Sequence, residues 1–106
     1  MTKIAVVFPG QGSQSIGMMA GWDDHPAVRA TFDEASEALG DDLWTLVTDG
    51  PADALSLTTN TQPVMLTAGV AAWRAWQAAG GAMPDVLAGH SLGEYAALVA
   101  AGALAF

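Results

Sequence analysis

"AGHSLGEYAALVAAGAL", residues 88–104, places one serine between two glycines and follows it with a run that carries a single charge, Glu94. Asp85 to Gly89 leads in as a short apolar strand, and Leu92 to Ala101 reads as a buried helix. Strand, sharp turn and helix in this order are the building unit of a parallel α/β layer. The stretch therefore predicts an α/β fold and a candidate reactive residue, Ser91.

The N-terminal half extends this pattern. Lys3 to Phe8, "KIAVVF", is β-branched and apolar on both faces, as expected for a buried parallel strand. A helix is predicted from Pro26, with Asp23 or Asp24 as its cap and Gly40 as its stop. We expect the two strands to share one sheet.

Further helices are predicted before the second strand. "DDLWTLVTDGP" indicates a short helix ended by Gly50, and "PADALSL" adds one turn. A long, largely apolar helix then opens at Pro63, capped by Asn60 or Thr61. Because two strands alone do not make a stable sheet of this class, a third strand is expected after Phe106.

Charge and composition exclude several kinds of partner and site. The net charge of -8 disfavours a nucleic acid or an anionic membrane as partner. The chain has no cysteine, which rules out disulfides and a thiol nucleophile, and its two histidines are too far apart in sequence to indicate a metal site. The first apolar run is too short for a signal peptide, and no segment approaches a membrane span, so a cytoplasmic location is expected.

Charged residues are scarce for a chain of this size. They make up 13% of the 106 residues, against about 25% in a typical globular domain, while apolar residues make up 52%. Small domains expose proportionally more surface than large ones. The composition thus predicts that a partner chain, or more of the same chain, covers part of the surface.

Gly89-His90-Ser91-Leu92-Gly93 matches the nucleophile elbow G-x-S-x-G. In that motif the backbone N–H of the residue after the serine, here Leu92, is the natural first donor of an oxyanion hole. A purely structural reading is compatible with it, because an elbow serine also opens a helix. Ser91 and Glu94 also fit the capping box S-x-x-E at a helix start.

The glycine-rich loop "PGQGSQ" after the first strand has three readings. As a dinucleotide fingerprint it lacks the third glycine, since Ser15 stands there. It could be a plain turn after a strand. If its strand neighbours the second one, it could also bring the backbone N–H of Gln11 beside Ser91 as the second oxyanion donor.

A base for the serine is harder to find. His25 lies at a predicted helix start and is expected to be a surface residue, whereas His90 is expected to pack beside the site. A serine needs a general base to act at neutral pH. The residues thus predict a nucleophile without its base.

Two motifs resemble one family, malonyl-CoA:acyl carrier protein transacylase of type II fatty-acid synthesis. They are "FPGQGSQ" and "AGHSLGEYAAL", and "DLWTLVTDGPADAL" and "TQPVMLTAGVAAWRAW" are also similar to that enzyme. The resemblance implies that Ser91 takes a malonyl group from coenzyme A as an ester and passes it to the phosphopantetheine thiol of acyl carrier protein. Gln11 and Leu92 would hold the oxyanion, and no metal or redox cofactor is implied.

The resemblance also implies an incomplete site. Family members are longer, with an α/β-hydrolase-like core and a small ferredoxin-like subdomain; residues 1–106 would be the N-terminal part of that core, truncated before the subdomain. The family's catalytic histidine and carboxylate-binding arginine lie after the serine helix and have no matching position here. Because Met1 opens directly into the first strand, a free-standing enzyme is favoured over a module of a larger synthase.

Two alternatives remain open at this point. One is a serine acyl hydrolase built on the same elbow. The other is an inactive fragment that folds only with a complementary piece, which would be the remaining part of the same enzyme.

Overall fold

The computed structural model describes residues 3–22 and 25–106. Its elements follow one another as β1 (Ala5–Phe8), the short 3-10 helix η1 (Ala20–Trp22), α1 (Pro26–Leu39), α2 (Leu43–Asp49), α3 (Ala52–Leu55), α4 (Thr58–Ala78), β2 (Val86–Gly89) and α5 (Gly93–Ala100). This is the predicted order of strand, helices, strand and helix. It is a mixed α/β fold with a small parallel sheet.

The strands β1 and β2 pair in parallel, with Ala5 opposite Val86 and Phe8 opposite Gly89. Both are slightly shorter than the sequence predicts. The prediction that the first strand is buried on both faces is wrong for this chain: Val7 is 72% exposed and Val86 57% exposed, on the face away from α5. Their hydrophobic pattern is that of a covered sheet, but the described residues cover only the other face.

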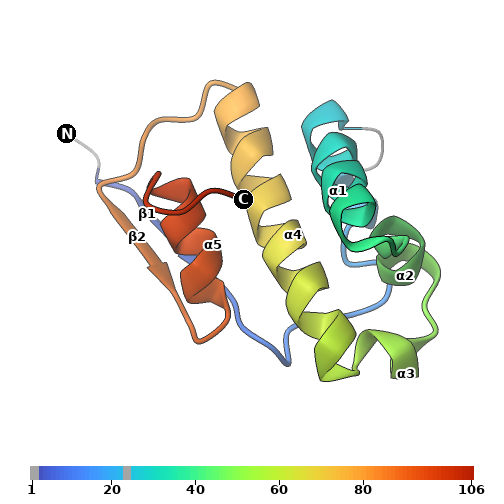
Figure 1. The fold of residues 1–106 in the computed structure, drawn as a ribbon. Helices are drawn as coiled ribbons and strands as arrows, with labels where there is room; N and C mark the ends of the chain where they lie inside the picture. Colours follow the sequence, from blue (N-terminus) through green and yellow to red (C-terminus); the bar gives the residue numbers. More distant parts are fainter. Residues whose placement is uncertain (1–2, 23–24) are drawn as a thin grey trace.

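The helix α4 lies in the middle of the molecule (Figure 1). It packs against α1 on one side and against α5 on the other, and α5 in turn packs on β1 and β2. One layer of helices therefore separates the strands from α1, α2 and α3.

The helix α1 starts and stops as predicted, at Pro26 and before Gly40, whose φ of 76° suits only a residue without a Cβ. Its cap is His25, whose Nδ1 accepts a hydrogen bond from the N–H of Ala27 at 3.3 Å. The predicted caps Asp23 and Asp24 lie outside the described residues.

The helix α4 begins earlier than predicted, at Thr58, so Pro63 lies inside it. Asn60 and Thr61 do not cap it. The Asn60 amide donates to the carbonyl of Ala54 at 2.9 Å, and the Thr61 hydroxyl donates to the carbonyls of Leu55 and Leu57. These side chains join α3 to the first turn of α4, which the sequence alone did not reveal.

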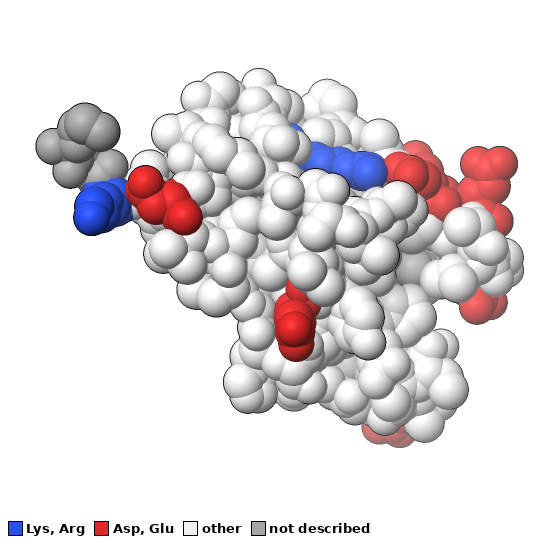
Figure 2. Space-filling view, turned by 60° about the vertical axis from the view of Figure 1, so that its left-hand side comes forward, with Lys and Arg blue, Asp and Glu red and all other residues white. Residues whose placement is uncertain are grey.

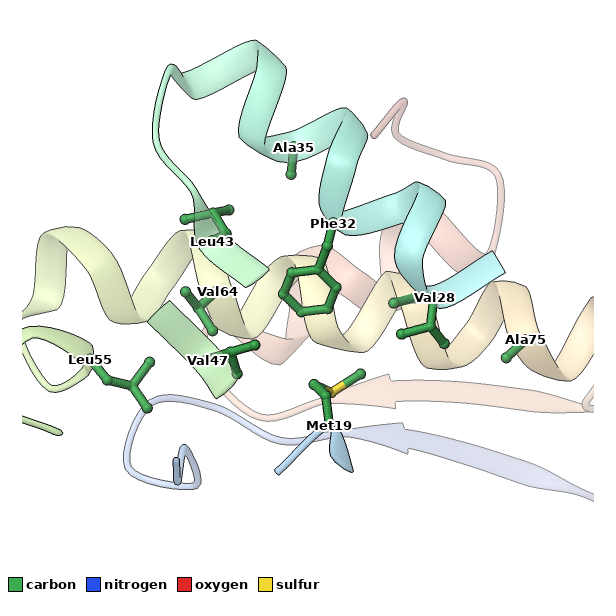
Figure 3. Packing of buried hydrophobic residues seen from close by; sticks show 10 residues of the cluster. Met19, Val28, Phe32, Ala35, Leu43, Val47, Leu55, Val64 and Ala75 are labelled. Carbon is green, nitrogen blue, oxygen red and sulfur yellow. The ribbon is translucent and has the colours of Figure 1, made fainter. Parts of the chain in front are cut away.

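The larger core lies between α1, α2 and α4. Phe32 of α1 points into it among Val28, Val47 and Val64, all of them fully buried (Figure 3). A second cluster of buried apolar residues joins β1, α4 and α5 and includes Phe8, Trp73 and Ala97. This second cluster holds the strand ends against α4 and α5.

Candidate active site

Ser91 occupies the turn between β2 and α5 in an unusual conformation. Its φ is 53°, and among the described residues it is the only non-glycine with a positive φ. Such a backbone costs about 1–2 kcal/mol in an L-residue, and it recurs where a side chain must be presented at a functional site. The side chain is exposed, as a nucleophile requires.

The capping-box prediction is wrong. The N–H of Glu94 donates to the backbone carbonyl of Ser91 at 3.0 Å, and no side chain caps α5, whose cap residue is Leu92. The positive φ of Ser91 explains the difference, because capping residues take extended backbone angles. The Ser91 hydroxyl makes no hydrogen bond with any described residue.

Two glycines make this tight turn possible. A Cβ at Gly89 would stand 2.1 Å from the carbonyl carbon of Gly93, and a Cβ at Gly93 would stand 2.2 Å from the carbonyl oxygen of Phe8. Backbone atoms fill both spaces, so no side chain fits at either position. The elbow therefore rests directly on the end of β1.

The loop after β1 contacts the same elbow, as expected if the two strands are neighbours. A Cβ at Gly10 would stand 2.5 Å from the carbonyl oxygen of His90, and the N–H of His90 donates to the carbonyl of Phe8 at 3.0 Å. His90 itself is exposed and lies against Gly10. The glycine loop and the serine turn thus meet at the carboxyl ends of the parallel strands.

Several backbone N–H groups at this junction have no acceptor among the described residues, and those of Gln11 and Leu92 are among them. In the loop, the N–H of Gly12 donates to Gln14 Oε1 at 2.7 Å and that of Ser13 to the carbonyl of Gly10 at 3.4 Å, whereas those of Gly10 and Gln11 are unbonded. On the elbow, the N–H of Leu92 is likewise unbonded. Those of Gln11 and Leu92 are the two donors that the sequence predicts for an oxyanion hole.

The Gln11 side chain is anchored separately from its backbone. Its Nε2 donates to the hydroxyl of Thr58, the first residue of α4, at 3.0 Å. Sequence reasoning did not single out Thr58, because the two residues are 47 positions apart. Only the tertiary structure brings them together.

Neither histidine bonds to Ser91 within the described part of the chain. His25 is engaged in capping α1, and His90 packs on Gly10. In residues 3–22 and 25–106 no group of three or more histidine, cysteine or acidic side chains has a metal-binding arrangement, and no helix is long and apolar enough to cross a membrane. A base for Ser91 is not found among these residues.

An open groove of about 510 Å³ lies between α1, α4 and α5. Leu92 and Tyr95 line it on α5, so it reaches the elbow, and Gln62 and Thr67 line it on α4. Most of its other walls are apolar, including Leu39, Leu66 and Phe106. A second apolar hollow of about 530 Å³ lies between β1, the glycine loop and α4.

Comparison with known families shows which family the chain belongs to. The family described as acyl transferase domain matches residues 5–106, which is nearly the whole chain. The chain belongs to the acyl transferase family. The elbow and the glycine loop both lie within the matched residues.

Relatives within the family share a narrower name. The malonyl CoA-acyl carrier protein transacylase of Salmonella typhimurium is 60% identical over 107 aligned positions. A crystal structure of an acyl-carrier-protein S-malonyltransferase from Burkholderia pseudomallei is 68% identical, with a TM-score of 0.97 over 99% of this chain. A chain in the structure of a type II polyketide synthase acyl-carrier protein in complex with its malonyl-transacylase is similar as well, with 56% identity and a TM-score of 0.91 over 95% of this chain.

This acyl transferase chain spans only part of those relatives. The match covers 35% of the Salmonella enzyme, 34% of the Burkholderia chain and 33% of the matched chain in the carrier-protein complex. About two thirds of each relative therefore has no counterpart in the residues described here.

Proposed function

We propose that this chain is the N-terminal part, residues 1–106, of the catalytic core of a malonyl-CoA:acyl carrier protein transacylase of fatty-acid synthesis. The observation that carries the proposal is the junction of elbow and glycine loop, where the loop contacts the turn that carries Ser91 and the N–H groups of Gln11 and Leu92 are unbonded, in a chain 60–68% identical to malonyl transferases. The strands β1 and β2 are parallel, and α5 packs on them and on α4. This arrangement is consistent with an α/β-hydrolase-like core that ends before a ferredoxin-like subdomain.

In the proposed reaction the Ser91 hydroxyl attacks the thioester carbonyl of malonyl-CoA and gives its proton to a base. The carbonyl oxygen becomes an oxyanion, which accepts hydrogen bonds from the N–H groups of Gln11 and Leu92. The carbon–sulfur bond then breaks, coenzyme A leaves as the protonated thiol, and a malonyl ester remains on Ser91. The phosphopantetheine thiol of acyl carrier protein attacks this ester in the same way. The chemistry needs no metal or redox cofactor.

The exposed apolar surface supports the proposal that further chain completes the enzyme. Ala5, Val7, Val86 and Ala88 form one exposed face of the sheet, and the strand pair has helices on its other face only. Charged side chains are few on the side of the molecule seen in Figure 2. A parallel sheet is stable when both faces are covered. The same additional chain would supply the base for Ser91.

The charge of this chain also indicates that the carrier protein docks on another part of the enzyme. The three basic residues, Lys3, Arg29 and Arg74, are outnumbered by eleven acidic ones. Arg74 is paired with Glu34 at 2.8 Å, and the Arg29 guanidinium lies over the Trp44 ring. An acidic carrier protein would need a basic surface for docking. We propose that the rest of the enzyme supplies it, and that the assembled enzyme works in the cytoplasm.

The test compares this chain alone with a chimera. In the chimera, residues 1–106 replace the matching N-terminal third of the Burkholderia pseudomallei malonyltransferase, which is 68% identical over this region. Each protein is exposed briefly to malonyl-CoA and its intact mass is measured, with Ser91→Ala as the control. We expect a malonyl adduct on Ser91 in the chimera and none in the Ser91→Ala chimera.

The remaining outcomes separate the alternatives. Release of free malonate without a thiol acceptor would favour a serine acyl hydrolase. An adduct on the chain alone would contradict the proposal that the base comes from additional chain. A chimera that folds but stays unmodified would overturn the assignment of Ser91.

A further inference from the structure

We propose that Thr58 is a positioning residue for the oxyanion hole: its hydroxyl holds the Gln11 side chain and thereby fixes the direction of the Gln11 backbone N–H. The inference rests on the proposed function. It assigns to the first residue of α4 a role that the elbow motif does not contain. The supporting geometry comes from the Gln11–Thr58 hydrogen bond and from the packing of Gly10 on the His90 carbonyl.

The hydrogen bonds of the loop leave several of its backbone N–H groups without an acceptor in the described structure, and that of Gln11 is one of them. The N–H groups of Gly12 and Ser13 are used within the loop, while that of Gln11 has no acceptor in the described structure. Gly12 has a φ of 107°, so the chain turns immediately after Gln11. The Gly10–Gln11 peptide carries the Gln11 N–H, and within the loop it is held only by the long 3.4 Å bond from the Ser13 N–H to the Gly10 carbonyl, so contacts outside the loop add to its restraint.

Two contacts outside the loop hold it. On one side Gly10 packs on the His90 carbonyl so closely that a Cβ would stand 2.5 Å from the oxygen. On the other side Gln11 Nε2 donates to Thr58 Oγ1 at 3.0 Å. Gly10 sets the distance between loop and elbow, and Thr58 sets the rotation of the Gln11 peptide.

The first turn of α4, which carries Thr58, is anchored by several hydrogen bonds. Leu57, just before it, accepts hydrogen bonds from the N–H groups of Asn60 and Thr61 at 2.8 and 2.7 Å. The Asn60 and Thr61 side chains bond to α3, so the first turn of α4 is fixed on two sides. The Thr58 hydroxyl therefore sits on a well-anchored turn and can hold the Gln11 side chain in a fixed place.

The test removes the hydroxyl and keeps the shape. Thr58→Val in the chimera should slow malonylation of Ser91 by roughly 10-fold to 100-fold, the range caused by a misplaced catalytic group. The KM for malonyl-CoA should change less than about twofold, because the oxyanion forms only in the transition state. Thr58→Ser should restore the rate. Thr48→Val, an exposed threonine of α2 with no side-chain hydrogen bond in the described structure, is the matched control.

A double-mutant cycle tests whether Thr58 affects the rate of malonylation through its hydrogen bond with Gln11. Gln11→Met removes the Nε2 donor and keeps the backbone N–H, so it should slow the reaction as Thr58→Val does. If both act through one hydrogen bond, the double variant will be no slower than the slower single variant. Multiplicative effects, or a Thr58→Val chimera as fast as the unmodified one, would overturn the role of Thr58. If the unmodified chimera forms no ester on Ser91, it is the proposed function that fails.

Discussion

Gly93 of α5 packs against the carbonyl of Phe8 at the end of β1 with no room for a side chain: a Cβ would stand 2.2 Å from the Phe8 oxygen and 2.7 Å from the Pro9 oxygen. The same Phe8 oxygen accepts the N–H of His90 at 3.0 Å. The Phe8 carbonyl thus accepts a hydrogen bond from the residue after β2 and also packs against the first residue of α5. The position of Ser91 depends on this contact.

Gly93→Ala should destabilise the chimera by about 1–3 kcal/mol or more, because its methyl group would meet backbone that cannot move without shifting the elbow. Thermal unfolding measures the effect. Gly21→Ala in η1 is the control, since a Cβ there has nothing within 4 Å. Equal melting temperatures for the two variants would contradict the close contact.

Replacing Ser91 separates backbone strain from chemistry. Ser91→Gly should stabilise the chimera by about 1 kcal/mol, because glycine adopts a φ of 53° without steric cost. Ser91→Ala should leave stability nearly unchanged, and both variants should lose the malonyl adduct. The order of their melting temperatures is the measurement, and a Gly variant less stable than the Ala variant would show that the turn is not strained.

The exposed sheet face predicts that Val7→Thr costs less stability in the chain alone than in the chimera. Val7→Thr keeps the shape and adds a hydroxyl on a side chain that is 72% exposed here. In the chain alone the change should be within about 0.5 kcal/mol, as at most surface positions. In the chimera it should cost about 1–3 kcal/mol, because a covered hydroxyl without a partner is unfavourable.

Denaturant unfolding of both proteins, with Val70→Thr as a control buried in either case, measures this difference. Where the chain alone does not unfold cooperatively, its solubility with and without Val7→Thr replaces that arm. An equal small cost in both proteins would mean that no further chain covers this face.

Asp42 predicts a pH-dependent contribution to stability. Its carboxylate accepts the Thr45 N–H at 3.0 Å and the Thr45 hydroxyl at 2.7 Å, and these bonds, the backbone one first, hold the pKa of Asp42 below its ordinary value. A lowered folded-state pKa stabilises the protein above the ordinary carboxyl pKa, and this contribution is lost as the pH falls through the folded pKa. Asp42→Ala should therefore lower the melting temperature of the chimera at neutral pH.

The difference between Asp42→Ala and the unmodified chimera should shrink toward acid pH. Asp41→Ala, a neighbouring carboxylate without a side-chain hydrogen bond in the described residues, is the control and should show a smaller loss. If the melting temperatures of Asp42→Ala and the unmodified chimera differ by the same amount at every pH, the Asp42 charge plays no part in capping α2.

Much of the fold could be predicted locally. Pro26 and Gly40 mark the ends of α1, Gly50 ends α2, and the glycines around Ser91 indicate the elbow, because backbone restrictions act within a few residues. The start of α4 was predicted wrongly at Pro63. Asn60 and Thr61 favour caps by type, and only the packing of α3 against α4 gives their side chains carbonyls to bond instead.

For the site, the sequence by itself determined the chemistry: one serine in a G-x-S-x-G turn, and a glycine loop after an apolar strand. The tertiary structure decided which distant residues contact one another at the site. Parallel pairing of β1 and β2 brings Gly10 against His90 across 80 positions, and α4 brings Thr58 to Gln11 across 47. Such contacts depend on how strands and helices pack over the whole chain, and no local pattern of residues records them.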